Sequence, residues 1–387
     1  MKKTLMVAAL TGVFATAAHA QSSVTLYGLI DAGITYTNNQ HGSSNVQMTS
    51  GSVNGSRFGL RGAEDLGGGL KAIFTLENGF GINDGTLKQN SRLFGRQAFV
   101  GLASAQYGAV TLGRQYDSMV DYVGPLALTG TQYGGTQFAH PFDNDNLNNS
   151  FRVNNSVKYT SANYGGLKFG ALYGFSNQAD GAAGQGFANN RAYSAGASYS
   201  FAGFNVAAAY LQLNSNGSLA ANTAAFNSGG AINGDNTFFA GRQQTWGAGA
   251  NYTFGPATAG IVYTQTNLSS LGGIGAGASG VTGGVGLNGS SAHFQNFEAN
   301  ARYALTPALS VAGSYTYTRA SLEGERPHWN QFNLQTAYAL SKRTDVYLQG
   351  EYQQVSSNNV VNADINGLAA SGNEKQVAVT AGLRHRF

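Results

Sequence analysis

The sequence predicts an all-β chain folded as a transmembrane barrel of sixteen antiparallel strands. Segments of about ten residues alternate apolar and polar side chains along the chain, and short turns alternate with long polar loops. Only 10% of the residues are charged, against about 25% in an ordinary soluble domain. No apolar run reaches the roughly 18 residues that a transmembrane helix needs. The chain has no Cys, which excludes disulfides and thiol chemistry.

The N-terminus has the features of a secretory signal peptide. Residues 1–3 (Met-Lys-Lys) are basic, residues 4–17 are apolar, and residues 18–20 (Ala-His-Ala) form a small-residue cleavage site. We therefore expect a signal peptide over residues 1–20 and a single barrel domain over residues 21–387. Without the two signal lysines, Lys plus Arg falls from 22 to 20 against 18 acidic residues. A net charge near +2 is too weak to indicate nucleic acid as a partner.

The connections between strands set the strand number. Seven short turn candidates, rich in Gly, Pro, Asn and Ser, lie at residues 65–69, 104–108, 163–166, 202–203, 255–256, 306–307 and 341–343. Eight longer segments lie near residues 38–54, 79–91, 116–151, 177–190, 213–241, 267–291, 320–329 and 356–373. Fifteen connections join sixteen strands, and an even strand number is typical of bacterial outer-membrane barrels.

The strand patterns also distinguish a membrane barrel from a soluble sandwich. In the first strand, Leu26, Ile34 and Tyr36 share one face, and Asp31 and Thr35 share the other. Such alternation alone would also fit a soluble β-sandwich. However, the apolar faces often end in Tyr or Phe and the polar faces carry spaced charges, as in barrels with aromatic girdles and a water-filled interior.

Several motifs resemble one known family. They are residues 24–33 (VTLYGLIDAG), 56–67 (SRFGLRGAEDLG), 94–102 (FGRQAFVGL), 112–115 (LGRQ) and 154–159 (NNSVKY), together with the terminal Phe387. The chain resembles the general porins of Gram-negative bacteria, particularly the β-proteobacterial branch. The resemblance is dense over the first 160 residues and returns at the C-terminus.

The resemblance implies an outer-membrane homotrimer in which each protomer holds its own pore, narrowed by a third loop that folds inward. Small hydrophilic solutes and ions, anions among them, would cross passively. The terminal Phe387 would be a recognition element for the outer-membrane assembly machinery. The other expected partners are outer-membrane lipid and lipopolysaccharide.

Basic residues on the inward parity are the candidates for pore selectivity. They form three pairs: Arg57 with Arg61 on the second strand, Arg92 with Arg96 on the fourth, and Arg152 with Lys158 on the sixth. By resemblance, Arg57, Arg96 and Arg152 best match the constriction arginines of the family. Alternatively, they are ordinary lumen charges away from the narrowest section.

The third loop, near residues 116–151, should form the opposite wall, because a connection of this length is usually functional. Asp117 and Asp121 come directly after the strand and are expected to line the constriction. Asp143 and Asp145 could line it too, face solvent or bind a cation. Because more arginines than acids are assigned to the pore, we predict a preference for anions.

Arg114 has the parity of Val110 and Leu112, which places it on the lipid side, where a lone arginine is costly. Two interpretations remain open. Arg114 could lie at a subunit interface, with Asp84 of a neighbour as its partner. A β-bulge could instead turn Arg114 inward.

No arrangement of Ser, His and acidic residues predicts an enzyme, and the His residues show no metal-ligand spacing, so no cofactor or metal is expected. The sequence therefore predicts a general-diffusion channel with a mild anion preference. The alternatives are a substrate-specific channel for small organic anions and a non-conducting adhesin or structural barrel. In the last case, the loops at 213–241 and 267–291 would be the contact surfaces.

Overall fold

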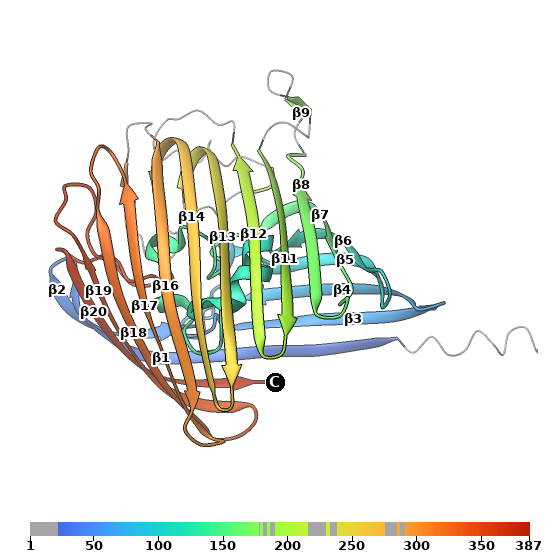
Figure 1. Cartoon of the computed structure of the whole chain (residues 1–387), viewed down its shortest axis with the longest axis horizontal. Coiled ribbons are helices and arrows are strands. Elements are labelled where there is room, and N and C mark those ends of the chain that lie inside the picture. Colours follow the sequence, from blue (N-terminus) through green and yellow to red (C-terminus); the bar gives the residue numbers. More distant parts are fainter. Residues whose placement is uncertain are drawn as a thin grey trace, which may run out of the picture.

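The structure is a computed structural model of the chain. It describes residues 22–177, 179–180, 184–185, 190–215, 230–232, 238–274, 285–286 and 291–387. The predicted signal peptide over residues 1–20 and large parts of the loops at 213–241 and 267–291 lie outside the described residues. Figure 1 shows strands side by side around an interior that holds short helices. Among the described residues, no helix is both long enough and apolar enough to cross a membrane.

The wall is one closed antiparallel sheet with sixteen strand positions. The wall strands are β1 (Ser23–Gln40), β2 (Ser43–Ser50), β3 (Arg57–Gly67), β4 (Leu70–Gly79), β5 (Gln97–Ser104), β6 (Gly108–Gln115), β7 (Val153–Thr160), β8 (Leu167–Gly174), β11 (Arg191–Phe201), β12 (Phe204–Asn214), β13 (Phe238–Phe254), β14 (Ala257–Ile274), β16 (Ala292–Ala304), β17 (Leu309–Ser321), β18 (His328–Ala339), β19 (Thr344–Val355) and β20 (Lys375–Arg386). The short strands β9 (Ala179–Asp180), β10 (Gly184–Gln185) and β15 (Val285–Gly286) belong to the connections.

β2 and β3 share one strand position because both pair with β1. Ser50 of β2 lies opposite Ala32, and Arg57 of β3 lies opposite Leu29. Residues 51–56 interrupt this strand. On its other edge, β1 pairs with β20, from Leu29 opposite Arg386 onward, and this pairing closes the barrel.

The seven predicted short turns all lie between consecutive wall strands, but the first predicted loop, 38–54, is wrong. β1 continues to Gln40, and a two-residue turn at His41 and Gly42, with φ of 50° and 95°, leads directly into β2. The polar residues around this turn favour a loop when the sequence is taken alone. The alternation nevertheless continues beyond it, because Val46 and Met48 both point outward and are exposed.

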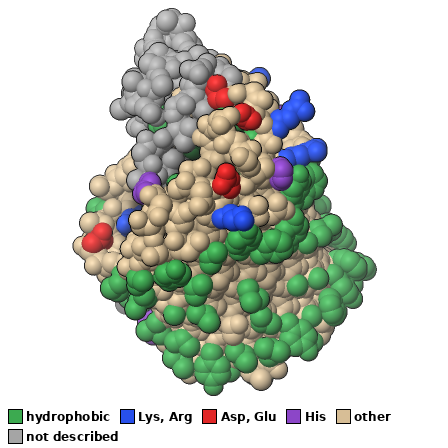
Figure 2. All heavy atoms as spheres, turned by 90° about the vertical axis from the view of Figure 1, so that its left-hand side faces the viewer, with side chains coloured by type: hydrophobic (Ala, Val, Ile, Leu, Met, Phe, Trp, Pro, Cys, Tyr) green, Lys and Arg blue, Asp and Glu red, His purple; other side chains and the backbone are tan. Residues whose placement is uncertain are grey.

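The two faces of the wall differ as the alternation predicts. Leu26 and Ile34 are about 60% exposed on the outside, whereas Asp31 and Thr35 are fully buried on the inside. Figure 2 shows apolar side chains gathered over the lower part of one face, with the acidic and basic side chains of that face lying above them. This apolar band is the surface that meets hydrocarbon.

The third long segment, between β6 and β7, lies against the inner wall. It contains the short helices η2 (Met119–Val123), η3 (Gly124–Leu126), η4 (Leu128–Gly130), η5 (Thr136–Phe138) and η6 (Pro141–Asp143). Met119 and Val123 pack with Leu172, Leu211 and Leu213 in a buried cluster on the inner faces of β8 and β12. An apolar core inside the barrel thus holds one end of the segment. One further helix, α2 (Lys88–Ser91), lies between β4 and β5.

Candidate pore lining

Three of the predicted arginines line one hollow inside the barrel. Arg57 begins β3, Arg61 lies four residues further along the strand, and Arg96 directly precedes β5. Thr131 and Gln132 of the third segment line the same hollow, whose volume is about 570 Å³. The guanidinium carbon of Arg61 lies 5.2 Å from the ring centre of Tyr27, close enough for a cation–π contact.

A carboxylate that was not predicted from the sequence lies in the same hollow as these arginines. Glu77 of β4 accepts a hydrogen bond from Arg96 Nε at 2.6 Å, which also forms an ion pair. The hydroxyls of Tyr27 and Tyr116 donate to Glu77 at 2.8 and 3.1 Å, and Arg96 Nη2 donates to the Tyr116 hydroxyl at 3.1 Å. Alternation along the strands could have predicted Glu77. Glu77 lies opposite Gly59 on the neighbouring β3 and therefore shares the inward face of Arg57.

The prediction that Arg92 and Arg96 share a parity on the fourth strand is wrong. β5 begins only at Gln97, so both arginines lie in the connection before it. Residues 93–94 form a turn between the two arginines, so the extended backbone on which a parity argument depends is absent there. Arg92 Nη1 donates to the Gln89 carbonyl at 3.3 Å, and Arg92 is not among the residues that line the hollow.

The basic pair assigned to the sixth strand contacts the third segment. Arg152 lies just before β7, is 3% exposed, and places its guanidinium carbon 5.7 Å from the ring centre of Tyr116. Lys158 of β7 forms an ion pair with Asp121 and donates to the Tyr116 carbonyl at 3.0 Å. The prediction placed Lys158 and Asp121 on opposite walls of an open pore. In the structure the two side chains are in direct contact.

Asp117 does not line the hollow either. Its side chain is fully buried and accepts hydrogen bonds from the Met119 backbone N–H and from Asn146 Nδ2, both at 2.7 Å. Burial raises the pKa of Asp117 to about 6, although these hydrogen bonds oppose the rise. The carboxylate accepts hydrogen bonds that stabilise the chain where the segment turns inward, so Asp117 has a structural role.

A β-bulge resolves the two interpretations of Arg114. The register between β6 and β7 shifts between Gly113 and Gln115. Gly113 has φ of 141°, and a Cβ added there would lie 2.1 Å from the Ala98 carbonyl oxygen. After the bulge, Arg114 is buried: its Nε donates to the Gly95 carbonyl at 2.8 Å and its Nη1 donates to Asn154 Oδ1 at 2.6 Å.

A pairing of Arg114 with Asp84 of a neighbouring subunit would require Arg114 to lie on the outer surface. Arg114 is buried within its own protomer, so this interpretation is wrong. Asp84 itself is exposed in the connection between β4 and β5. It accepts hydrogen bonds from the backbone N–H and the hydroxyl of Thr86 at 3.0 and 2.8 Å, and these lower the pKa of Asp84.

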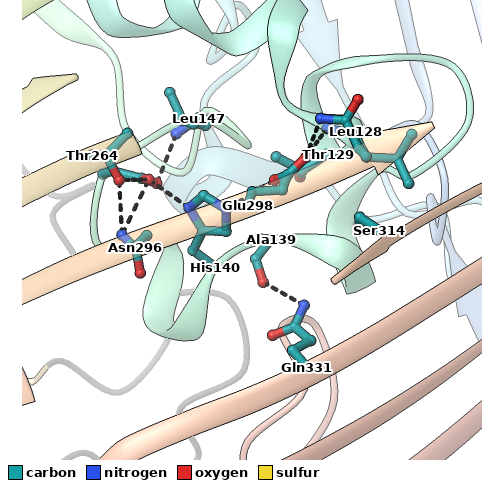
Figure 3. Close-up of polar contacts among 12 residues, drawn as sticks. Leu128, Thr129, Ala139, His140, Leu147, Thr264, Asn296, Glu298, Ser314 and Gln331 are labelled. Carbon is teal, nitrogen blue, oxygen red and sulfur yellow. Dashed lines mark hydrogen bonds and ion pairs between the residues drawn. The ribbon is translucent and has the colours of Figure 1, made fainter. Parts of the chain in front are cut away.

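The buried His140 connects the third segment to β16 of the barrel wall (Figure 3). His140 Nδ1 lies 2.6 Å from Asp145 Oδ2, and His140 Nε2 lies 2.9 Å from Glu298 Oε2 on β16. Burial opposes a charge on the ring, but the two carboxylates outweigh burial and raise the pKa of His140 to about 10. The ring is therefore an imidazolium at neutral pH and donates to both carboxylates.

Neighbouring contacts extend this anchor. Thr264 Oγ1 donates to Asp145 Oδ2 at 2.6 Å, and the Leu128 backbone N–H donates to Glu298 Oε1 at 2.8 Å. Sequence spacing could not show this, because Glu298 lies 158 residues beyond His140. Further along, the buried Arg384 of β20 donates to the Gln132 carbonyl at 3.0 Å and forms an ion pair with Asp345.

The terminal Phe387 lies beside the first strand. Its backbone N–H donates to the Gly28 carbonyl at 3.1 Å, and the Gly28 N–H donates to the Phe387 carbonyl at 3.0 Å. The ring covers Gly28 so closely that a Cβ there would lie 2.3 Å from it.

Comparison with known proteins identifies the family. The family model described as Gram-negative porin matches residues 5–359. The chain is a Gram-negative porin. This porin is 34% identical to an outer membrane porin protein of Bordetella pertussis and 29% identical to outer membrane porin protein 32 of Delftia acidovorans, with every chain covered in full.

In structure, the porin is similar to the anion-selective porin from Comamonas acidovorans, with a TM-score of 0.72. The match covers 95% of this chain and 100% of that one at 24% identity, which establishes a common fold. These findings confirm the predicted family, the sixteen-stranded barrel and the location in the outer membrane of a Gram-negative bacterium.

Proposed function

We propose that each protomer is a general-diffusion pore for small hydrophilic solutes that favours anions and performs no covalent chemistry. The proposal rests on the hollow lined by Arg57, Arg61 and Arg96. Among the described residues that line it, Glu77 is the one acidic side chain, and it is paired with Arg96. Fixed positive charge along a narrow aqueous path attracts anions and repels cations.

The arrangement of the third segment supports the same sign of selectivity. Asp121 is paired with Lys158, and Asp117 is buried within the segment, so neither contributes free negative charge to the pathway. The relative from Comamonas acidovorans is described as anion-selective. We extend that property to this porin as part of the proposal.

The remaining partners belong to the same proposal. The porin would form a homotrimer in outer-membrane lipid and lipopolysaccharide after the assembly machinery has inserted it. Outward-facing apolar residues such as Val24, Leu26, Val100 and Leu102 offer an uncharged surface for subunit or lipid contact. Conductance that closes in three equal steps would support the trimer.

Single-channel recording tests the selectivity. In a KCl gradient across a planar bilayer, the reversal potential should show chloride preference, and Arg57→Gln should reduce that preference. Arg242→Gln is the matched control, because Arg242 is exposed on β13 and is not among the residues that line the hollow. Cation preference of the unaltered porin would overturn the proposal.

A further inference from the structure

One buried carboxylate on the inner wall stands apart from the network that holds the third segment. Glu351 of β19 is 3% exposed, and neither of its oxygens has a hydrogen-bond partner among the described residues. Glu351 also takes part in no ion pair within the described chain, in contrast to Glu77 and Asp345. Burying an isolated carboxylate is very costly unless a positive charge or a proton accompanies it.

The neighbours of Glu351 also present acceptor oxygens. Asn333 of β18 lies directly opposite Glu351, and Gln335 lies opposite Gln349, which precedes Glu351 by two residues on β19. Directly opposed Cβ atoms are about 5 Å apart, and residues i and i+2 on one strand are about 7 Å apart. The side-chain amide oxygens of these three residues are buried and lack a partner within the described part of the chain, as does the hydroxyl of Thr316 on β17.

The amide nitrogens of the same residues are already engaged elsewhere. Asn333 Nδ2 donates to Ser314 Oγ at 2.9 Å, Gln335 Nε2 donates to the Gln132 carbonyl at 3.4 Å, and Gln349 Nε2 donates to Gln137 Oε1. Because the nitrogens donate toward β17 and the third segment, the polar atoms left without a partner on this part of the inner wall are oxygens.

A cluster of this composition suits a cation better than a proton. Protonation of Glu351 would supply a single O–H donor for one of the surrounding oxygens. A hard cation would interact with all of them, and carboxylate and amide oxygens are the ligands that calcium prefers. An anion is excluded, because the cluster would repel it.

We infer that Glu351, with the amide oxygens of Asn333, Gln335 and Gln349, forms a calcium site between the inner wall and the third segment. With one carboxylate, the site belongs to the weak class, with a dissociation constant of about 10⁻⁴–10⁻³ M. Gln132 and Gln137 belong to the third segment, so an occupied site also holds that segment through the Gln335 and Gln349 side chains.

Equilibrium dialysis against radioactive calcium chloride tests this inference. The detergent-solubilised porin is first treated with a chelator to remove bound cations. We expect one calcium ion per protomer in the unaltered protein. Glu351→Gln keeps the shape and removes the charge, so binding at 1 mM calcium should be lost. Asn333→Ala should weaken binding about tenfold. Far-ultraviolet circular dichroism checks that both variants have folded.

Glu64→Gln is the matched control, because Glu64 is an exposed carboxylate on β3 and should contribute nothing to the site. Calcium should also raise the unfolding temperature of the unaltered porin and of E64Q but not that of E351Q. The inference is overturned if the unaltered porin binds no calcium, which would leave a proton on Glu351. Equal binding by the unaltered porin and E351Q would also overturn it. The inference does not depend on the proposed ion selectivity, which the bilayer experiment tests separately.

Discussion

At the scale of single residues, the charge in the pore depends on pairing as much as on position. Arg57 and Arg96 line the same hollow, but only Arg96 shares a hydrogen bond and an ion pair with Glu77. Two tyrosine hydroxyls also donate to Glu77, so its charge is satisfied on several sides. Glu77 therefore determines how much of the arginine charge remains available to a passing ion.

Replacing Glu77 with glutamine should increase anion preference. The amide keeps an acceptor for Arg96 but removes a negative charge from the hollow, so the chloride-to-potassium permeability ratio should rise roughly twofold. Reversal potentials in a KCl gradient measure this ratio. Glu64→Gln serves as the control, since Glu64 is exposed and does not line the hollow. A fall in the ratio would mean that Glu77 mainly orients Arg96.

Residue parity predicted the site only where the backbone is extended. Arg57 and Arg61 lie on β3 and line the hollow as predicted. Arg92 and Arg96 lie before β5, where a turn at residues 93–94 ends the alternation, and the Asp117 side chain is buried within the third segment. Lys158 and His140 pair with residues that are distant in sequence, and the spacing of residues along the chain cannot predict such pairs.

At the scale of elements, the third segment is fixed to the wall at several points and by different interactions. An apolar cluster around Met119 and Leu211 holds one end, the His140 anchor holds the middle, and Arg384 reaches Gln132. Because the His140 anchor is buried and ionic, removing one partner should leave uncompensated charge.

His140→Gln should destabilise the porin by about 3–5 kcal/mol at pH 7, the usual cost of breaking a buried ion pair. The pKa of His140 is raised from 6.5 to about 10, so its stabilisation is complete below pH 6.5 and is lost as the pH rises through 10. The difference between the variant and the unaltered porin should therefore shrink at pH 10.5. Urea unfolding at both pH values measures it, and an equal difference at both would contradict a charged His140.

The bulge in β6 requires a residue without a side chain at position 113. Gly113→Ala should destabilise the barrel by about 1–3 kcal/mol, because Gly113 has φ of 141° and a Cβ there meets the Ala98 carbonyl. Gly69→Ala is the control: Gly69 also has a positive φ, but no atom lies within 4 Å of its added Cβ. Similar thermal unfolding for both variants would show that the bulge tolerates a side chain.

The strand plan could be predicted because strands and turns are local. Gly, Pro, Asn and Ser placed all seven short turns, and alternation placed most wall strands. The first long connection was wrong because Asn, Gln and His residues continue the strand to a tight turn. The bulge at Gly113 left two interpretations of Arg114 open, since one extra residue reverses every later parity.

At the scale of the whole molecule, the low charge content follows from the closed wall. A surface that faces hydrocarbon cannot carry charges cheaply. Charged residues such as Asp31, Glu351 and Arg384 are buried in the interior, and on the face drawn in Figure 2 the charged side chains lie above the apolar band. Closure itself depends on the first and last strands, which are far apart in the chain and pair from Leu29 with Arg386 to Thr37 with Ala378.

The proposed role of Phe387 in recognition by the assembly machinery can be separated experimentally from its part in barrel closure. Its backbone hydrogen bonds to Gly28 do not depend on the side chain, and the residue is 41% exposed. Phe387→Ala should therefore fold normally from urea into detergent but accumulate severalfold less in the outer membrane of cells. Leu383→Ala, an outward-facing residue of the same strand, is the control and should leave assembly intact. Equal loss of refolding and of assembly in F387A would instead assign the ring to packing over Gly28.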